Sequence, residues 1–149
     1  MMLKTHLVVC FAFLLFLIDK VANEFLFLIV GMFATLLPDI DCVSSYLGNR
    51  WYVRPVQWFT SHRGLLHSLS FCIFLSLIVS LFLPKLAFPF FLGYGIHLLL
   101  DSFTVEGIRP FWPIKSEVSG LVSSGGSVDE GVFICFSLIS IILVIGLFT

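Results

Sequence analysis

Residues 131–148 read GVFICFSLISIILVIGLF, a stretch without a charged side chain. Its length approaches the roughly 20 residues that a helix needs to cross the hydrocarbon core of a bilayer. Four other apolar stretches precede it: Leu7–Ile18, Val21–Leu37, Gly64–Leu83 and Phe88–Phe103. Gly64–Leu83 also approaches spanning length. The other three are shorter, so we expect their helices to extend into flanking residues such as Lys4 or to meet a locally thinned bilayer.

The composition is that of a membrane protein. Hydrophobic residues make up 59% of the chain and charged residues 11%, with a mean hydropathy of +1.11. Soluble domains are nearer to half apolar and a quarter charged. Helix is the expected conformation, because every backbone polar group in hydrocarbon needs a partner within its own segment. We therefore predict an all-α, polytopic membrane helical bundle of about five transmembrane helices, forming a single membrane-embedded domain over residues 1–149.

The positive charges predict the orientation of this bundle. Two polar segments, Asp39–Arg63 and Thr104–Glu130, connect the helices on the side where the chain begins. Six of the eight Lys and Arg residues fall on that side, and Lys20 and Lys85 fall on the other. The positive-inside rule then places the N-terminus and both long loops in the cytoplasm, in a multi-pass protein of the inner or plasma membrane. Because no small-x-small site follows Leu7–Ile18, we expect this run to be retained rather than cleaved.

Other classes of partner find less support in the sequence. The formal net charge is -1 and no basic run is present, which argues against nucleic acid. The four cysteines form no CxxC pair and are interpreted mainly as small buried hydrophobes. Cys42 stands next to Asp41 and would be able to ligate a soft metal, although a structural thiol is the favoured interpretation. The composition predicts the lipid bilayer as a partner, and no sequence feature predicts an oligomeric state.

Most ionisable residues are predicted to gather at the cytoplasmic end of the bundle. Alternate helices run in opposite directions, so the start of one helix lies beside the end of the next. The starts of the first, third and fifth helices and the ends of the second and fourth carry His6, Asp39, Asp41, His62, Arg63, His67, His97, Asp101 and Glu130. A single interfacial histidine is more often structural than functional. Ionisable groups in membrane spans are costly, however, and a convergent set of them predicts a functional site.

The spacing of these residues is typical of a metal site. His97 and Asp101 are an i, i+4 pair, so both project from one helical face. Asp39 and Asp41 follow a proline in a turn, where alternate carboxylates point the same way. His62 and His67 are five residues apart, about 140° around a helix. Either His62 lies on the loop before the helix, or the two histidines serve different ions.

Four imidazoles and three carboxylates match the nitrogen and oxygen ligands of Zn²⁺, with Mn²⁺ and Fe²⁺ as less favoured choices. The seven donors exceed one tetrahedral shell. The site therefore holds two ions, or some of the donors orient an imidazole rather than bind metal. The predicted metal ligands are His6, Asp39, Asp41, His62, His67, His97 and Asp101.

The chain resembles a family of YdjM-like, LexA-regulated inner-membrane proteins that are described as metal-dependent hydrolases. The similar motifs run in order along the chain: Thr5-His6, Leu36-Leu37-Pro38-Asp39-Ile40-Asp41, His62-Arg63-Gly64-Leu65-Leu66-His67-Ser68, Gly95-Ile96-His97 through Asp101-Ser102-Phe103-Thr104 to Gly107, and Phe111-Trp112-Pro113. This sequence has Cys42-Val43 where the family often has His-Pro after the aspartate pair. The resemblance implies hydrolase activity and the same set of site residues.

We therefore expect a metal-dependent hydrolase that acts on a phosphate-containing or lipid-linked substrate at the cytoplasmic membrane face. Glu130, or an aspartate that binds no metal, would be the general base. Arg63 would hold the anionic group of the substrate, or would serve only as a positive-inside anchor.

The alternative is a metal-binding transporter or sensor without hydrolysis; a purely structural scaffold leaves the clustered ionisable groups without a purpose. A transporter needs polar groups that continue across the membrane. The far halves of the helices are almost wholly apolar, interrupted only by Ser76, Ser80, Ser137 and Ser140.

Overall fold

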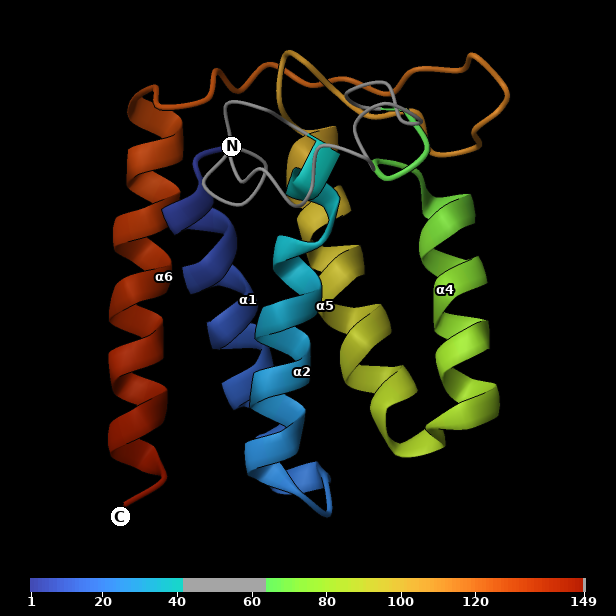
Figure 1. The fold of residues 1–149 in the computed structure, drawn as a ribbon. Coiled ribbons are helices and arrows are strands. Elements are labelled where there is room, and N and C mark those ends of the chain that lie inside the picture. Colours follow the sequence, from blue (N-terminus) through green and yellow to red (C-terminus); the bar gives the residue numbers. More distant parts are fainter. Residues whose placement is uncertain (42–63, 149) are drawn as a thin grey trace.

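The computed structural model describes residues 1–41 and 64–148. In this part of the chain the regular structure is helical, and the expected all-α class is confirmed (Figure 1). The helices are α1 (Leu3–Leu17), α2 (Glu24–Leu36), α4 (Leu69–Phe82), α5 (Pro84–Ser102) and α6 (Ser127–Gly146), with short 3-10 helices η1 (Ile18–Lys20) and η2 (Pro38–Asp41). Two isolated bridges, Thr104 with Val122 and Ile108 with Val118, tie together the loop between α5 and α6.

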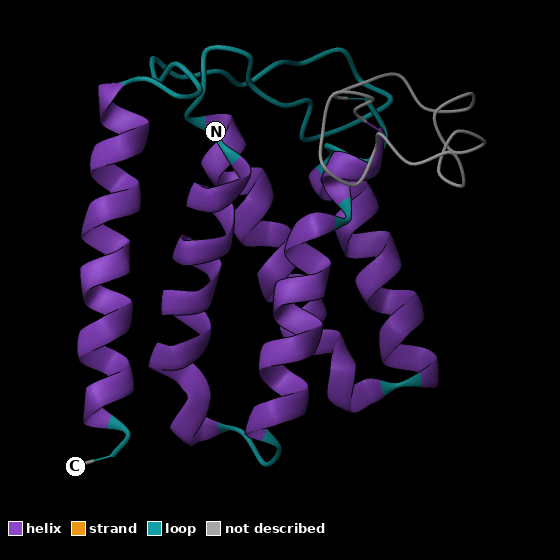
Figure 2. Ribbon diagram, turned by 60° about the vertical axis from the view of Figure 1, so that its left-hand side comes forward, coloured by secondary structure: helices purple, strands orange, loops and turns teal. Residues whose placement is uncertain are grey.

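The five α-helices stand side by side with their axes roughly aligned (Figure 2). Helix α5 packs against α2 and α4, and α1 packs against α2, α5 and α6. The N-terminus, η2, the end of α5 and the start of α6 lie at one end of the bundle, together with the loop from α5 to α6 (Figure 1). The C-terminal end of α6 lies at the opposite end. The predicted alternation of helix directions is thus present in the described residues.

Local capping explains where the structure departs from the expected boundaries. The third apolar stretch was expected to be helical from Gly64, but α4 begins only at Leu69. Ser68 is its N-cap, with Oγ accepting a hydrogen bond from the Phe71 N–H at 3.2 Å. His67 therefore lies in a turn before the helix and not on its first turn. Helix α5 starts at Pro84, which suits the first turn of a helix because the missing N–H would have no partner there.

The backbones of α2 and α5 are in direct contact where the two helices cross. A Cβ atom placed on Gly93 of α5 would lie 2.0 Å from the carbonyl oxygen of Gly31 of α2, so only glycine fits there. Thr35 Oγ1 lies 3.0 Å from the carbonyl oxygens of both glycines and 2.8 Å from Cys10 Sγ of α1. Small residues at such crossings allow close packing where no hydrophobic force joins the helices. This contact fixes α1, α2 and α5 relative to one another.

The outer faces of the bundle are apolar. Exposed side chains include Phe74, Leu77 and Leu81 on α4 and Leu138 and Ile142 on α6. Among the described residues, α6 alone is both long and apolar enough to cross a membrane, with a mean hydropathy of 2.3 over its most apolar part. Helix α4 is apolar but shorter. The five-span topology therefore stays a prediction, while the apolar exterior is what lipid contact requires.

Candidate metal centre

Five of the predicted metal ligands meet at one end of the bundle. His6 comes from α1, Asp39 from η2, His67 from the turn before α4, and His97 and Asp101 from the last turns of α5. His6, His67, His97 and Asp101 are each at most 3% exposed, whereas the Asp39 side chain is 23% exposed. The predicted convergence is confirmed for these five, and Asp39 is the member that reaches the surface.

The separations between the donor atoms suit a metal ion. His67 Nε2 and His97 Nε2 each lie 3.6 Å from Asp101 Oδ2, and they lie 3.9 and 3.7 Å from Asp39 Oδ1. These distances exceed the 2.7–3.2 Å of an ordinary N–H···O hydrogen bond. Ligands held about 2.0–2.1 Å from a tetrahedral ion are about 3.4 Å apart. The cluster therefore has the spacing of donors that surround a cation.

Two of the imidazoles are oriented by backbone carbonyl groups. His97 Nδ1 lies 2.8 Å from the Thr35 carbonyl oxygen, and His6 Nδ1 lies 3.1 Å from that of Met2. A carbonyl oxygen only accepts, so Nδ1 carries the hydrogen in each ring and Nε2 presents a lone pair. This tautomer is inferred from the hydrogen-bond partner. Metal-binding histidines are held in the same way, through the nitrogen that does not bind.

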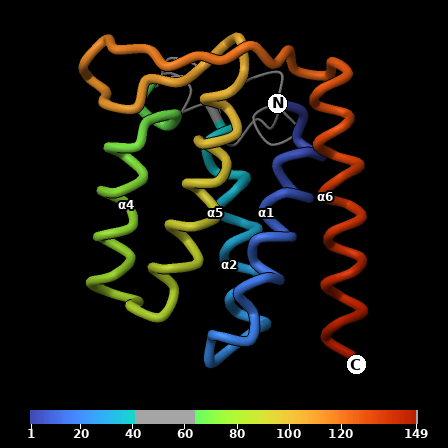
Figure 3. The backbone as a smooth tube through the Cα atoms, turned by 180° about the vertical axis from the view of Figure 1, so that it is seen from behind, coloured from blue at the N-terminus to red at the C-terminus, as the bar shows by residue number. Residues whose placement is uncertain are grey.

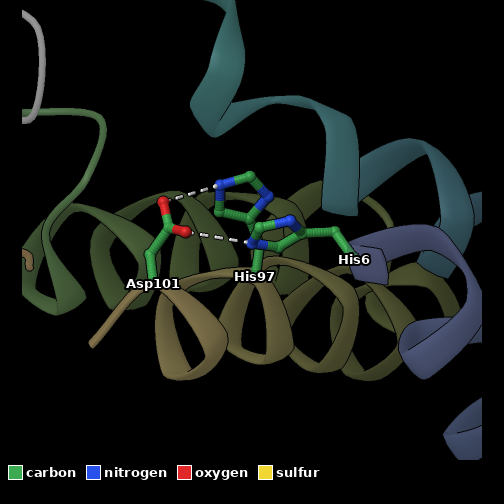
Figure 4. A group of neighbouring side chains, drawn as sticks. All are labelled: His6, His97 and Asp101. Atoms are coloured by element: carbon green, nitrogen blue, oxygen red, sulfur yellow. Dashed lines mark ion pairs between the residues drawn. The ribbon is translucent and has the colours of Figure 1, made fainter. Parts of the chain in front are cut away.

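The lone pairs of His6 and His97 point at a carboxylate. Figure 4 shows both rings converging on Asp101, and His6 Nε2 lies 3.2 Å from Asp101 Oδ1. The two rings stack with their centroids 4.1 Å apart. Both Nε2 atoms are buried and have no hydrogen-bond partner among the described residues, although such atoms are normally satisfied. A cation or a proton between such facing acceptor atoms would satisfy them, and the site therefore suits a metal ion.

The donors form two overlapping groups, His6 with His97 and Asp101, and Asp39 with His67 and His97. The ligand atoms of each group lie within 4.8 Å of one another. His97 belongs to both groups but offers only Nε2, because Nδ1 is engaged by Thr35. Asp101 turns Oδ1 toward His6 and Oδ2 toward the other imidazoles. The geometry accommodates one ion with a choice of donors, or two ions bridged by a carboxylate. The amino nitrogen of Met1 also lies 2.8 Å from Asp101 Oδ1.

The remaining predicted site residues are placed differently. Glu130 lies in the first turn of α6, where Oε1 is 2.6 Å from Lys4 Nζ and both side chains are partly exposed. It belongs to neither donor group, and its role as general base stays a prediction. The backbone of Asp41 ends η2. Its side chain lies outside what the structure describes, as do Cys42, His62 and Arg63.

Three residues that sequence analysis did not single out support the site. Thr35 supplies the carbonyl that orients His97. Tyr94 donates from its hydroxyl to the Leu66 carbonyl oxygen at 2.6 Å, which holds the turn that carries His67. Asp129 is buried and accepts from the backbone N–H groups of Met2 and Gly125, joining the start of α1 to α6. A polar side chain within an apolar run is the only sequence signal that marks Thr35 or Tyr94.

Comparison with known proteins gives the family. The chain matches the family described as YdjM inner membrane protein over residues 1–148. The chain belongs to this family. It is 35% identical over 114 residues to inner membrane protein YdjM of Escherichia coli (strain K12) and to that of Shigella flexneri. These matches cover 69% of this chain and 58% of each relative, so the chain spans less than two thirds of their length.

A relative from Bacillus subtilis (strain 168), the uncharacterized protein YvsG, is 31% identical over 105 residues, which cover 67% of this chain and 66% of YvsG. No solved structure matches the chain. Membership of the YdjM family confirms the resemblance drawn from the sequence motifs and assigns the chain to the inner membrane. The apolar outer face of α6, the described helix that is long enough to span a membrane, agrees with this location.

Proposed function

We propose that this YdjM-family protein is a membrane-bound metal-dependent hydrolase that acts on a phosphate-containing or lipid-linked substrate at the cytoplasmic membrane face. The observation that carries the proposal is the pair of buried Nε2 atoms of His6 and His97 that face the Asp101 carboxylate. Their other ring nitrogens are engaged by carbonyl groups, which leaves the lone pairs available to a metal. Ionisable groups buried in a membrane bundle are costly and are kept where they act.

The donor chemistry favours zinc. Imidazole nitrogen and carboxylate oxygen are usual ligands of Zn²⁺. Mn²⁺ and Fe²⁺ bind the same atoms with lower affinity. His6, Asp39, His67, His97 and Asp101 would hold one or two ions, with Asp41 and His62 as further predicted ligands. A bound ion of this kind supplies Lewis-acid activation of water and of the scissile bond.

Residues of this chain would act as the general base and as the binding group for phosphate. Asp39 is the most exposed of the five donors, so it lies where water and substrate arrive and would take the proton from water if it binds no metal. Glu130 is the other proposed base, and its ion pair with Lys4 would have to open first. Arg63 stands four residues before His67 in the sequence and would bind a phosphate group through charge-assisted hydrogen bonds.

A lipid-linked substrate fits the surroundings of the site. The elements that carry the donors meet at one end of the bundle (Figure 1), and most exposed side chains of α4 and α6 are apolar. A lipid in the adjoining leaflet would keep its tails beside these helices and bring its head group to the level of Asp39. The six-to-two distribution of cations supports a multi-pass topology with this end in the cytoplasm.

The second candidate function is metal sensing or transport without hydrolysis. Burial of four of the five donors favours it, because catalytic zinc sites keep a position open to water whereas structural sites are closed. A hydrolase turns over a substrate, whereas a metal sensor or transporter does not. Protein loaded with Zn²⁺, Mn²⁺ or Fe²⁺ is tested on phospholipids, polyprenyl phosphates and generic phosphodiesters, with Asp101→Ala as the control. The hydrolase proposal predicts turnover that Asp101→Ala loses. Metal-replete protein that is inert on every substrate supports the sensor.

A further inference from the structure

An apolar groove of about 520 Å³ runs along α5 on the side away from the metal donors. Its walls include Phe13 of α1, Leu69 of α4 and Leu92 and Leu99 of α5. The one hydroxyl in the lining, that of Ser102, donates to the Leu99 carbonyl oxygen and is already satisfied. Seen from behind, α5 lies between α4 and α1, the helices that contribute to the groove walls (Figure 3).

The opening of the groove depends on Gly95. A Cβ atom placed on Gly95 would have no described atom within 4 Å outside its own helix backbone and chain neighbours, in contrast to Gly93, which is pressed against α2. Glycine is among the poorest helix formers, so a glycine without a packing reason in mid-helix is unusual. Gly95 is two residues from His97, about 200° around the helix. The groove and the metal donors therefore occupy opposite faces of α5.

We propose that this groove binds one acyl chain of a membrane phospholipid. The lining from Phe91 to Ser102 spans about 16 Å along the helix at 1.5 Å per residue. One leaflet of a bilayer contributes about 15 Å of hydrocarbon. The groove therefore has the length of one chain in one leaflet, and its Ser102 end lies at the level of the metal donors. In an inner-membrane protein the outward opening faces lipid.

The Ser102 end of the groove suits the head group of a phospholipid. Ile108, Pro110 and Val118 of the loop after α5 close this end. Arg109 stands between two of these residues, and its partly exposed guanidinium donates to Glu117 at 2.8 Å. A phosphate beside the closed end would pair with this cation in place of Glu117 at the membrane surface, where basic side chains attract anionic lipid.

A helix of a second copy is the competing occupant, and the cross-linking test below distinguishes it from a lipid chain. The proposal does not depend on hydrolysis, because the binding face is opposite the metal donors. Binding of a chain here is compatible with either function of the site.

The test uses the full-length protein in vesicles of phosphatidylethanolamine and phosphatidylglycerol that contain a trace of phospholipid with a diazirine on its acyl chain. After illumination, labelled positions are mapped by mass spectrometry. Labelling on the exposed face of α6, at Leu138 and Ile142, reports bulk lipid. We expect labelling at Leu92, Leu99 and Ser102 to exceed this reference in the wild-type protein.

Gly95→Leu fills the groove and is expected to lower the labelling of these groove residues to the α6 reference level. Gly95→Ala, a smaller obstruction, is expected to give an intermediate value. Gly131→Leu is the matched control, because Gly131 also lies in a helix with open space around it but outside the groove, and it should leave the labelling unchanged. All three variants should keep wild-type metal content, which shows that they fold.

Three results would overturn the proposal. The first is wild-type groove labelling no higher than at α6, which would mean bulk lipid only. The second is groove labelling that Gly95→Leu leaves intact in a protein that retains its metal. The third is cross-linking of groove residues to a second polypeptide in place of lipid.

Discussion

Replacement of His97 is expected to disturb the metal centre whichever of the two donor groups holds the ion. Among the described residues, His97 is the one imidazole that belongs to both donor groups, and its Nε2 binds one ion at a time. If the groups hold separate ions, His6→Ala should remove one equivalent of metal, His67→Ala the other, and His97→Ala the one equivalent that its Nε2 binds. If they hold one ion, all three variants should lower its affinity and His97→Ala should lower it most.

The expected loss of metal affinity in His97→Ala follows from the role of this side chain as a metal ligand. Loss of a residue that only orients a ligand costs about 10–100-fold in metal affinity, so loss of the shared ligand itself should cost at least about 100-fold. His97→Ala also leaves the buried Thr35 carbonyl without its partner, at a cost of about 1–3 kcal/mol in the metal-free protein. Unfolding of the metal-free protein therefore has to be measured beside metal binding.

The assay is elemental analysis of detergent-purified protein together with competition titration of Zn²⁺. Leu99→Ala is the matched control, because Leu99 is exposed on the opposite face of the same helix turn. It should retain wild-type metal. The reasoning would be refuted if His97→Ala bound metal with wild-type stoichiometry and affinity, or if Leu99→Ala lost as much.

Other predictions follow from the packing and the topology. Thr35→Val removes the hydroxyl that ties α2 to α5 but keeps the carbonyl that orients His97, so it should lower the free energy of unfolding by about 1 kcal/mol with little change in metal content, and Thr35→Ser should restore stability. Gly93→Ala forces a Cβ atom into the α2 backbone and should destabilise the fold by about 1–3 kcal/mol in thermal unfolding, whereas Gly131→Ala should not. Reporter fusions at Ser124 and after Thr149 should report opposite sides of the membrane, and reports from the same side would contradict the five-span topology.

The helices and the gathering of the donors were predictable because both follow from periodic, local features. Uninterrupted apolar runs locate helices, and the alternation of helix directions brings the start of α1 beside the end of α5. The i, i+4 spacing of His97 and Asp101 also holds in the structure, where both face the bundle interior. These predictions required no knowledge of how the helices pack.

The remaining details depend on tertiary partners that a sequence does not reveal. The Ser68 cap delays the start of α4 and moves His67 into a turn, which removes the helical constraint expected for it. The role of Thr35 arises only where α2 meets α5 at two glycines. Glu130 pairs with Lys4 because α1 packs against α6, and the charge pattern alone did not indicate this pairing.

The central claim is that imidazole and carboxylate groups at the end of the bundle hold a divalent metal ion. The most direct test is X-ray absorption spectroscopy of the zinc-loaded, detergent-purified protein. We predict nitrogen and oxygen ligands at about 2.0–2.2 Å, outer-shell scattering from at least two imidazole rings, and loss of that scattering in the His6→Ala, His97→Ala double variant. A first shell with sulfur at about 2.3 Å, or a spectrum that the double variant leaves unchanged, would contradict the account.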